Sequence, residues 1–228
     1  MLFSLLDQIQ VDPYQALVSS GGFLVALLFA LTIHEFSHAL AATRLGDPTP
    51  GSLGRLSLSP LAHLDPFGTL MLLLAGFGWA KPVPIDPSQL RIGPRSGMAV
   101  VALAGPLSNI AAAAIFAIPI NGGIGDPGLF GQLTFPGGSV VGYLLLTAVF
   151  WNLLLASFNL VPLVPLDGYK AALGMLPREA GLEYAKLEKY GSGPLMIVIM
   201  IGFAVPGMGL FSLVLNPLIR ILGSLVLW

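Results

Sequence analysis

The residues with the clearest chemical potential are His34, Glu35 and His38, which form an HExxH motif. Side chains four positions apart lie on one face of an α-helix, so both imidazoles can reach a single metal ion. Glu35 is then placed to act as a general base on a water molecule that zinc activates. The motif lies inside the apolar stretch 21–42, where an ionisable group is costly and marks a functional site. These residues therefore predict hydrolysis carried out within a membrane.

A zinc hydrolase needs a third protein ligand and an open position for water. The chain has no cysteine, so that ligand must be a histidine or a carboxylate. The candidates are His63, the loop residues Asp47, Asp65, Asp86, Asp126 and Asp167, and the glutamates Glu179, Glu183 and Glu188. Asp167 stands out because two prolines end an apolar helix before it and Gly168 permits an unusual turn directly after it. Such irregular backbone at membrane depth is tolerated where it lines a cavity, which favours Asp167 as the third ligand.

The composition indicates that lipid is the main solvent of this chain. Its 228 residues are 55% hydrophobic and only 9% charged, whereas a soluble domain carries roughly 25% charged residues. The net charge of −1 and the lack of a basic run argue against nucleic acid as a partner. The length fits a single membrane domain over residues 1–228.

Four stretches are apolar enough to cross a bilayer, which takes about 20 residues as a helix. They are residues 21–43, 97–120, 140–163 and 194–222. Prolines and a glycine interrupt the last one, so we expect either one long, kinked helix or two shorter ones. Residues 66–84 contain an apolar run too short to span. The expected fold is an all-α polytopic membrane protein with about four transmembrane helices and a small membrane-embedded hairpin or re-entrant loop.

The basic residues predict how the chain is oriented. Lysines and arginines are concentrated in residues 44–96 and 167–193, whereas the N-terminal segment and the loop 121–139 contain none. Cytoplasmic loops carry the excess of positive residues, so the two basic segments should face the cytoplasm. The HExxH motif lies toward the cytoplasmic end of the first span, and Asp167 follows the third span on the same side. Topology alone thus brings Asp167 to the depth of the two histidines.

Four segments together resemble the site-2 protease family of intramembrane zinc metalloproteases, in its compact bacterial and archaeal form without a PDZ or CBS domain. They are the HExxH motif at 34–38, GWAKPVP at 78–84, AGPLSN at 104–109 and NLVPLVPLDG at 159–168. The likeness covers roughly residues 20–195. The segment around 67–84 would form a membrane-embedded hairpin or loop whose edge strand could pair with an unwound substrate.

The resemblance implies one Zn²⁺ per chain, bound by His34, His38 and Asp167, with Glu35 activating the water. It implies that Asn159 helps to hold the substrate backbone or the developing oxyanion. The expected activity is that of a zinc-dependent endopeptidase in regulated intramembrane proteolysis, which cleaves peptide bonds within or next to transmembrane segments. The expected partners are a transmembrane protein or peptide substrate and the lipid bilayer, and the expected location is a prokaryotic cell membrane, as a multi-pass protein.

The residues themselves leave two alternatives open. One is a zinc-binding membrane protein without protease activity, such as a transporter or a sensor. Transporters usually show internal repeats and polar residues spread over several spans, and neither is visible in this sequence. The other is an inactive protease homologue that serves as a binding partner. The intact Glu35 argues against this alternative, because loss of the general base is the simplest route to inactivity. Asn109 is interpreted as a helix-packing and hydrogen-bonding residue, and His63 as an interfacial loop residue.

Overall fold

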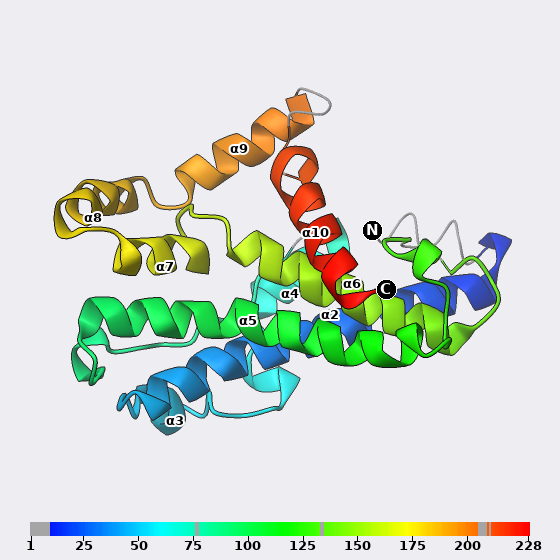
Figure 1. The fold of residues 1–228 in the computed structure, drawn as a ribbon, viewed down its shortest axis with the longest axis horizontal. Helices are drawn as coiled ribbons and strands as arrows, with labels where there is room; N and C mark the ends of the chain where they lie inside the picture. Colours follow the sequence, from blue (N-terminus) through cyan, green and yellow to red (C-terminus); the bar gives the residue numbers. More distant parts are fainter. Residues whose placement is uncertain (1–9, 76–77, 133–134, 205–208, 210) are drawn as a thin grey trace.

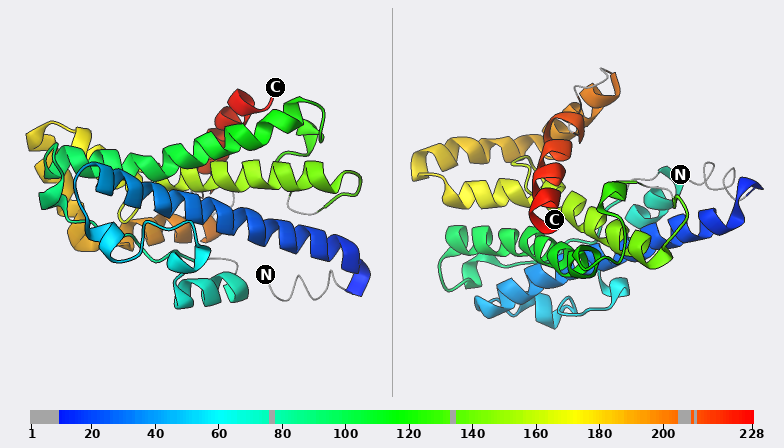
Figure 2. Two further views of the ribbon diagram at one scale, coloured as in Figure 1. Left: turned by 90° about the horizontal axis from the view of Figure 1, so that it is seen from below. Right: turned by 45° about the vertical axis from the view of Figure 1, so that its right-hand side comes forward.

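Three long apolar helices form the centre of the protein. The computed structural model describes residues 10–75, 78–132, 135–204, 209 and 211–228. The long helices are α2 (Pro13–Arg44), α5 (Pro94–Asn121) and α6 (Val140–Asn159), which lie side by side along the length of the molecule (Figures 1 and 2). Each is long and apolar enough to cross a bilayer. The prediction of an all-α membrane protein is confirmed, because every regular element in the described residues is helical.

The first long helix begins earlier than its apolar run predicts. Helix α2 starts at Pro13, where Asp12 caps it by accepting a hydrogen bond from the Gln15 amide at 3.0 Å. Proline at the first helical position lacks only an amide that would have no partner there. Its 32 residues make a rod of about 48 Å at 1.5 Å per residue, longer than the hydrocarbon core of a bilayer. The capping residues, rather than hydrophobicity, therefore set where this helix begins.

Small residues allow the long helices to pack closely. The buried face of α2 is rich in alanine, and Gly22 lies where a Cβ atom would come within 2.7 Å of the Leu144 side chain on α6. Small side chains at such contacts let helix backbones approach, which favours association in lipid. Between α5 and α6, small and larger apolar residues together form a buried cluster, namely Ala113, Ala117, Ile120, Leu146, Val149 and Leu153.

The C-terminal apolar stretch forms two short helices instead of one span. They are α9 (Gly193–Ala204) and α10 (Asn216–Val226), with a π-helical turn at Phe211–Leu215 before α10. Helix α10 crosses α6 at a steep angle (Figure 1). Of the two predicted outcomes for residues 194–222, the structure therefore shows the divided one. Among the described residues three helices are long enough to qualify as spans and Leu213–Val226 is a shorter apolar helix, and Pro206 and Gly207 lie outside the described residues.

The segment between α2 and α5 folds back on itself. It contains α3 (Thr49–Ser52) and α4 (Pro66–Ala75), followed by an extended return. Gly68 and Gly78 bring the outgoing and returning backbones together, since a Cβ on Gly78 would lie 2.2 Å from the Gly68 carbonyl oxygen. One antiparallel bridge joins Leu64 to Ala80. The ten residues of α4 span about 15 Å, which suits the re-entrant form expected for 66–84 better than a hairpin of two strands.

Two short helices follow α6 and carry the remaining polar residues near the site. They are α7 (Asp167–Met175) and α8 (Arg178–Ala185). Arg95 of α5 holds the end of α7, because its Nε donates to the Leu173 carbonyl oxygen at 2.8 Å. Gly174 lies against α5, where a Cβ would come within 2.4 Å of the Ala99 methyl group. This packing places the first residue of α7 opposite α2.

Candidate metal centre

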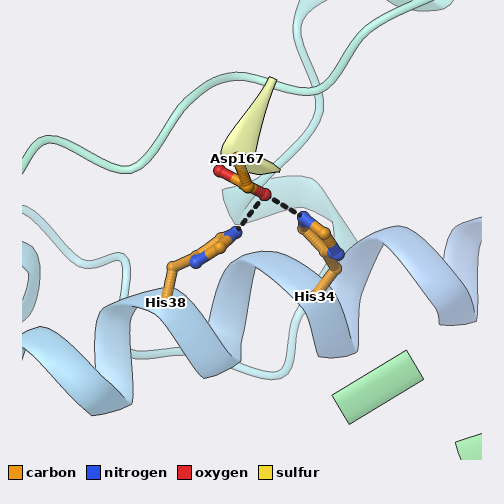
Figure 3. Close-up of side chains that lie close together, drawn as sticks. All are labelled: His34, His38 and Asp167. Atoms are coloured by element: carbon orange, nitrogen blue, oxygen red, sulfur yellow. Dashed lines mark hydrogen bonds and ion pairs between the residues drawn. The ribbon is translucent and has the colours of Figure 1, made fainter. Parts of the chain in front are cut away.

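Three side chains from two distant parts of the chain converge on one point (Figure 3). His34 and His38 lie one turn apart on α2, and Asp167 is the first residue of α7. The Asp167 Oδ2 atom lies 3.1 Å from His34 Nε2 and 3.0 Å from His38 Nε2. All three residues are buried, and their potential ligand atoms lie within 4.8 Å of one another. The structure thus brings together the three residues that the sequence proposes as metal ligands.

Close packing of a glycine positions Asp167. Gly168 follows it within α7 and has no positive φ, so it does not make the unusual turn that the sequence predicted. Its role is to let the backbones approach, because a Cβ there would lie 2.3 Å from the Leu160 carbonyl oxygen. The contact fixes the start of α7 against the loop that leaves α6. Gly168 is needed at this position because it lacks a side chain.

The Asp167 carboxyl is an anion in this setting. Burial alone would raise its pKa, but hydrogen bonds and charge from protonated imidazoles at His34 and His38 would more than reverse that effect and hold the pKa below its usual value. The other carboxylate oxygen, Oδ1, lies 3.7 Å from the Lys170 ammonium group. The negatively charged form is the one that can bind a metal ion.

Helix α5 orients both imidazole rings. His38 Nδ1 lies 2.7 Å from the Val101 carbonyl oxygen, and His34 Nδ1 lies 2.7 Å from Asn109 Oδ1. A carbonyl oxygen can only accept, so each Nδ1 carries the proton and donates it. In a neutral imidazole the Nε2 atom then holds a lone pair, and both of these lone pairs point at Asp167.

This arrangement of donors fits a divalent metal ion. Two lone pairs and a carboxylate oxygen at 3.0–3.1 Å repel one another unless a cation lies among them or both imidazoles take up a second proton. Charging two buried imidazoles is expensive, whereas a shared cation satisfies all three donors. Two imidazole nitrogens and one carboxylate, with the other ring nitrogens hydrogen bonded, are the ligand set of a catalytic zinc site. The residues present therefore fit zinc.

Gly105 of α5 leaves the space that the imidazoles occupy. A Cβ atom at this position would lie 2.4 Å from His38 Nε2 and 2.7 Å from His34 Cε1. Pro106 follows inside the helix and cannot donate to the Ala102 carbonyl, so α5 lacks one backbone hydrogen bond there. In the sequence, segment 104–109 was identified only by its resemblance to the site-2 protease family, and its packing against the two imidazoles was not predicted.

The three residues open onto a cleft of about 760 Å³. Glu35, half-buried on α2, and Asn159, at the end of α6, line the same cleft. Asn159 also donates its Nδ2 to the Leu155 carbonyl oxygen of its own helix at 3.1 Å. The rest of the lining is mostly apolar and comes from α2, α4, α6 and the return segment 79–85, including Leu31, Leu72, Trp151, Val83 and Ile85. All five site residues named from the sequence thus border one apolar cleft.

Of the other candidate ligands, His63 and the loop aspartates have structural roles elsewhere. His63, interpreted as an interfacial loop residue, is buried within the protein at 1% exposure. Its Nε2 lies 2.7 Å from the Ser57 carbonyl oxygen, so this ring helps to fold the loop after α3. The loop carboxylates accept hydrogen bonds from backbone amides: Asp47 from Thr49 and Asp86, Asp65 from Gly68, Asp86 from Ser88, and Asp126 from Gly128.

Sequence reasoning missed the residues that support the site from the neighbouring helices. Asn109 was interpreted as a helix-packing and hydrogen-bonding residue, but that His34 is one of its partners was not predicted. Its own amide group bonds to Asn152 on α6. The sequence feature that could have identified them is the presence of two asparagines inside apolar spans. Polar side chains are costly there and usually have a functional role.

Comparison with known proteins gives similar bacterial relatives, of which three are described. The chain is 35% identical to "Putative zinc metalloprotease YwhC" of Bacillus subtilis over 206 residues, which cover 90% of this chain and 83% of the relative. It is 29% identical to "Putative zinc metalloprotease Rip2" of Mycolicibacterium smegmatis, over 85% of this chain and 72% of that one. The Rip2 protein of Mycobacterium tuberculosis is 28% identical, with 86% of this chain and 72% of the relative covered. No family model and no solved structure matches.

Proposed function

The chain belongs to the site-2 protease family of zinc metalloproteases, and from this premise we propose that it cleaves peptide bonds within or next to transmembrane segments of membrane proteins. The observation that carries the proposal is the meeting of His34, His38 and Asp167 beside Glu35, at the side of an apolar cleft. The relatives' names support a metalloprotease, and the three apolar helices support a membrane protein.

The chemistry follows from the residues around the cleft. One zinc ion, held by His34, His38 and Asp167, would lower the pKa of a water molecule and polarise the scissile carbonyl. Glu35 accepts the proton of the attacking water and passes it to the leaving amine, as a general base and then a general acid. Asn159, on the wall of the same cleft, is placed to donate to the substrate backbone or to the oxyanion that develops on it.

The lining of the cleft supports an apolar, membrane-embedded substrate. Leucine, isoleucine and tryptophan side chains surround the polar centre, and they would solvate the side chains of a transmembrane segment. A helical substrate keeps its carbonyl groups in hydrogen bonds, so it must unwind locally before attack. The extended segment 79–85 borders the cleft and offers an edge for strand addition, to which Pro82 and Pro84 are suited because they donate no ladder hydrogen bond.

We place the site toward the cytoplasmic side of a prokaryotic cell membrane in a multi-pass protein. His34 and His38 precede Arg44, the last residue of α2, by about 9–15 Å along the helix axis. The charged helices α7 and α8 follow Asp167. The positive-inside tendency puts both of these polar regions in the cytoplasm.

The test measures zinc content and cleavage in the same detergent-purified samples. The wild type should hold about one zinc per chain, Asp167→Ala much less, and Glu35→Gln as much as the wild type. Proteoliposomes with a panel of single-span model substrates should then show cleavage by the wild type and none by Glu35→Gln. A wild type without zinc, after purification without chelators, would contradict the proposal. A zinc-loaded wild type that cleaves no member of a broad panel would favour a transporter or sensor.

A further inference from the structure

We propose that Asn109 and Asn152 are positioning residues of the metal centre, which act in series to fix the tautomer of His34. This inference rests on the zinc site proposed above. The two amides would hold the ring so that its Nε2 presents a lone pair to the metal. Their role would be to support the ligand, without contact to metal or substrate.

The two asparagines form a continuous chain of hydrogen bonds across three helices. Asn109 Oδ1 lies 2.7 Å from His34 Nδ1, and Asn109 Nδ2 donates to the Ala30 carbonyl oxygen and to Asn152 Oδ1, each at 2.9 Å. Asn152 Nδ2 donates to the Ala148 carbonyl oxygen at 2.9 Å. Both asparagines are fully buried. These hydrogen bonds thus connect α6 to α5, and α5 to His34 on α2.

Backbone carbonyl groups next to the two asparagines determine which atoms of this hydrogen-bond network donate and which accept. The Ala148 carbonyl can only accept, so the nitrogen of the Asn152 amide must face it and the oxygen must face Asn109. The Asn109 amide must then direct its nitrogen toward Asn152 and Ala30, which leaves its oxygen for His34. An amide oxygen only accepts, and therefore His34 Nδ1 must carry the proton. Every polar atom of both asparagine side chains is satisfied in this orientation and would not be in the reverse one.

The consequence for metal binding concerns which ring nitrogen is available. If His34 lost its acceptor, the imidazole could move its proton to Nε2 and donate to Asp167 Oδ2, which lies 3.1 Å away. That tautomer has no lone pair for a metal on the side of the cleft. Removing a hydrogen-bond partner behind a ligand typically lowers metal affinity about 10–100-fold. Simple helix packing by the two asparagines predicts no such selective effect.

The experiment compares zinc affinity among variants that remove, keep or disorient the oxygen that accepts from His34. Asn109→Leu removes the acceptor at nearly constant volume, Asn109→Asp keeps an oxygen facing His34, and Asn152→Leu removes the group that orients Asn109. Thr147→Val is the matched control, because Thr147 is buried on α6 and bonds only to the Tyr143 carbonyl of its own helix. Zinc dissociation constants are measured by chelator competition in detergent, and Co²⁺ absorption spectra report ligand geometry.

We expect Asn109→Leu to bind zinc about 10–100-fold more weakly than the wild type and to alter the Co²⁺ spectrum. Asn109→Asp should recover part of the affinity, because its carboxylate still accepts from His34 although it cannot donate to Ala30 or Asn152. Asn152→Leu should show a smaller loss than Asn109→Leu, and Thr147→Val should match the wild type. If Asn109→Leu fails to fold, Asn152→Leu beside Thr147→Val decides. Wild-type affinity in the leucine variants, or equal losses in Thr147→Val, would overturn the proposed positioning role of Asn109 and Asn152. A wild type that binds neither metal would instead overturn the proposed function.

Discussion

At the scale of single residues, the site depends on a missing side chain as much as on its ligands. Gly105 faces both imidazoles, and a Cβ there would lie 2.4 Å from His38 Nε2. Because that distance is far below van der Waals contact, Gly105→Ala must displace the rings or separate α5 from α2. We expect zinc affinity to fall at least about 10-fold, as for the loss of other supporting contacts. Zinc per chain after dialysis against a weak chelator measures the loss.

Gly21→Ala is the control for this substitution. Gly21 lies on α2, where a Cβ would have no atom within 4 Å. Alanine is favoured over glycine in a helix interior by about 1 kcal/mol, so this variant should be at least as stable as the wild type. Equal zinc binding by Gly105→Ala and Gly21→Ala would show that the imidazoles do not need the space at Gly105.

The sequence and the structure differ in what they reveal about individual residues. His34, Glu35 and His38 could be proposed from spacing alone, because one helix fixes their relation. Asp167 could be proposed from the prolines and glycine around it. Gly105, Asn109 and Asn152 could not, because their relation to His34 depends on how α5 and α6 are rotated against α2. That rotation is set by packing, which a hydropathy pattern within one helix does not determine.

At the scale of elements, a buried arginine holds the wall of the cleft. The Arg55 guanidinium donates to the carbonyl oxygens of Ala62 at 2.6 Å, Lys81 at 3.3 Å and Pro82 at 3.2 Å. Hydrogen bonds to a charged group are each worth about 1.5–3 kcal/mol. The arginine therefore ties the loop after α3 to the return segment 79–85, which lines the cleft.

We expect Arg55→Ala to loosen this wall without removing the metal. Zinc content should stay at the wild-type level, whereas KM for a cleaved model substrate should rise several-fold. The Lys81 amide, which donates to the His63 carbonyl oxygen at 2.8 Å, should exchange its hydrogen faster. Arg178→Ala, at an exposed position on α8, is the control. Unchanged KM and exchange in Arg55→Ala would show that the segment is held by other contacts.

Element boundaries were predicted best where hydrophobicity decides them. The spans expected at 97–120 and 140–163 correspond to α5 and α6 within a few residues. The start of α2 was missed because Asp12 and Pro13 determine it, and both lie outside the apolar run. The C-terminal stretch is equally apolar, yet it forms α9 and α10 separately. Composition predicts that a segment prefers lipid, whereas its breaks depend on local backbone chemistry.

At the scale of the whole molecule, a bound zinc should stabilise the fold. The ligands come from α2 and from α7, so the metal would link the first long helix to the segment that follows α6. A ligand that binds only the folded state adds about 2.7 kcal/mol at 100 times its Kd. We expect a chelator to lower the Tm of the wild type in detergent and to leave that of Asp167→Ala nearly unchanged. Equal shifts in both proteins would place the stabilising metal elsewhere.

The orientation of the molecule in the membrane can be tested cleanly because the chain has no cysteine. From the three candidate spans and the distribution of basic residues we expect the loop 121–139 outside and α8 in the cytoplasm. A single cysteine at Ile124, which is exposed in that loop, should react with a membrane-impermeant maleimide in intact spheroplasts. A cysteine at Glu179, exposed on α8, should react only after the membrane is permeabilised. The reverse pattern would place the site toward the outer side of the membrane. Labelling of both cysteines before permeabilisation would mean that α6 does not cross the membrane as a single span between them. The side on which the metal centre lies decides which part of a substrate's transmembrane segment can reach it, so this measurement bears directly on the choice of substrates.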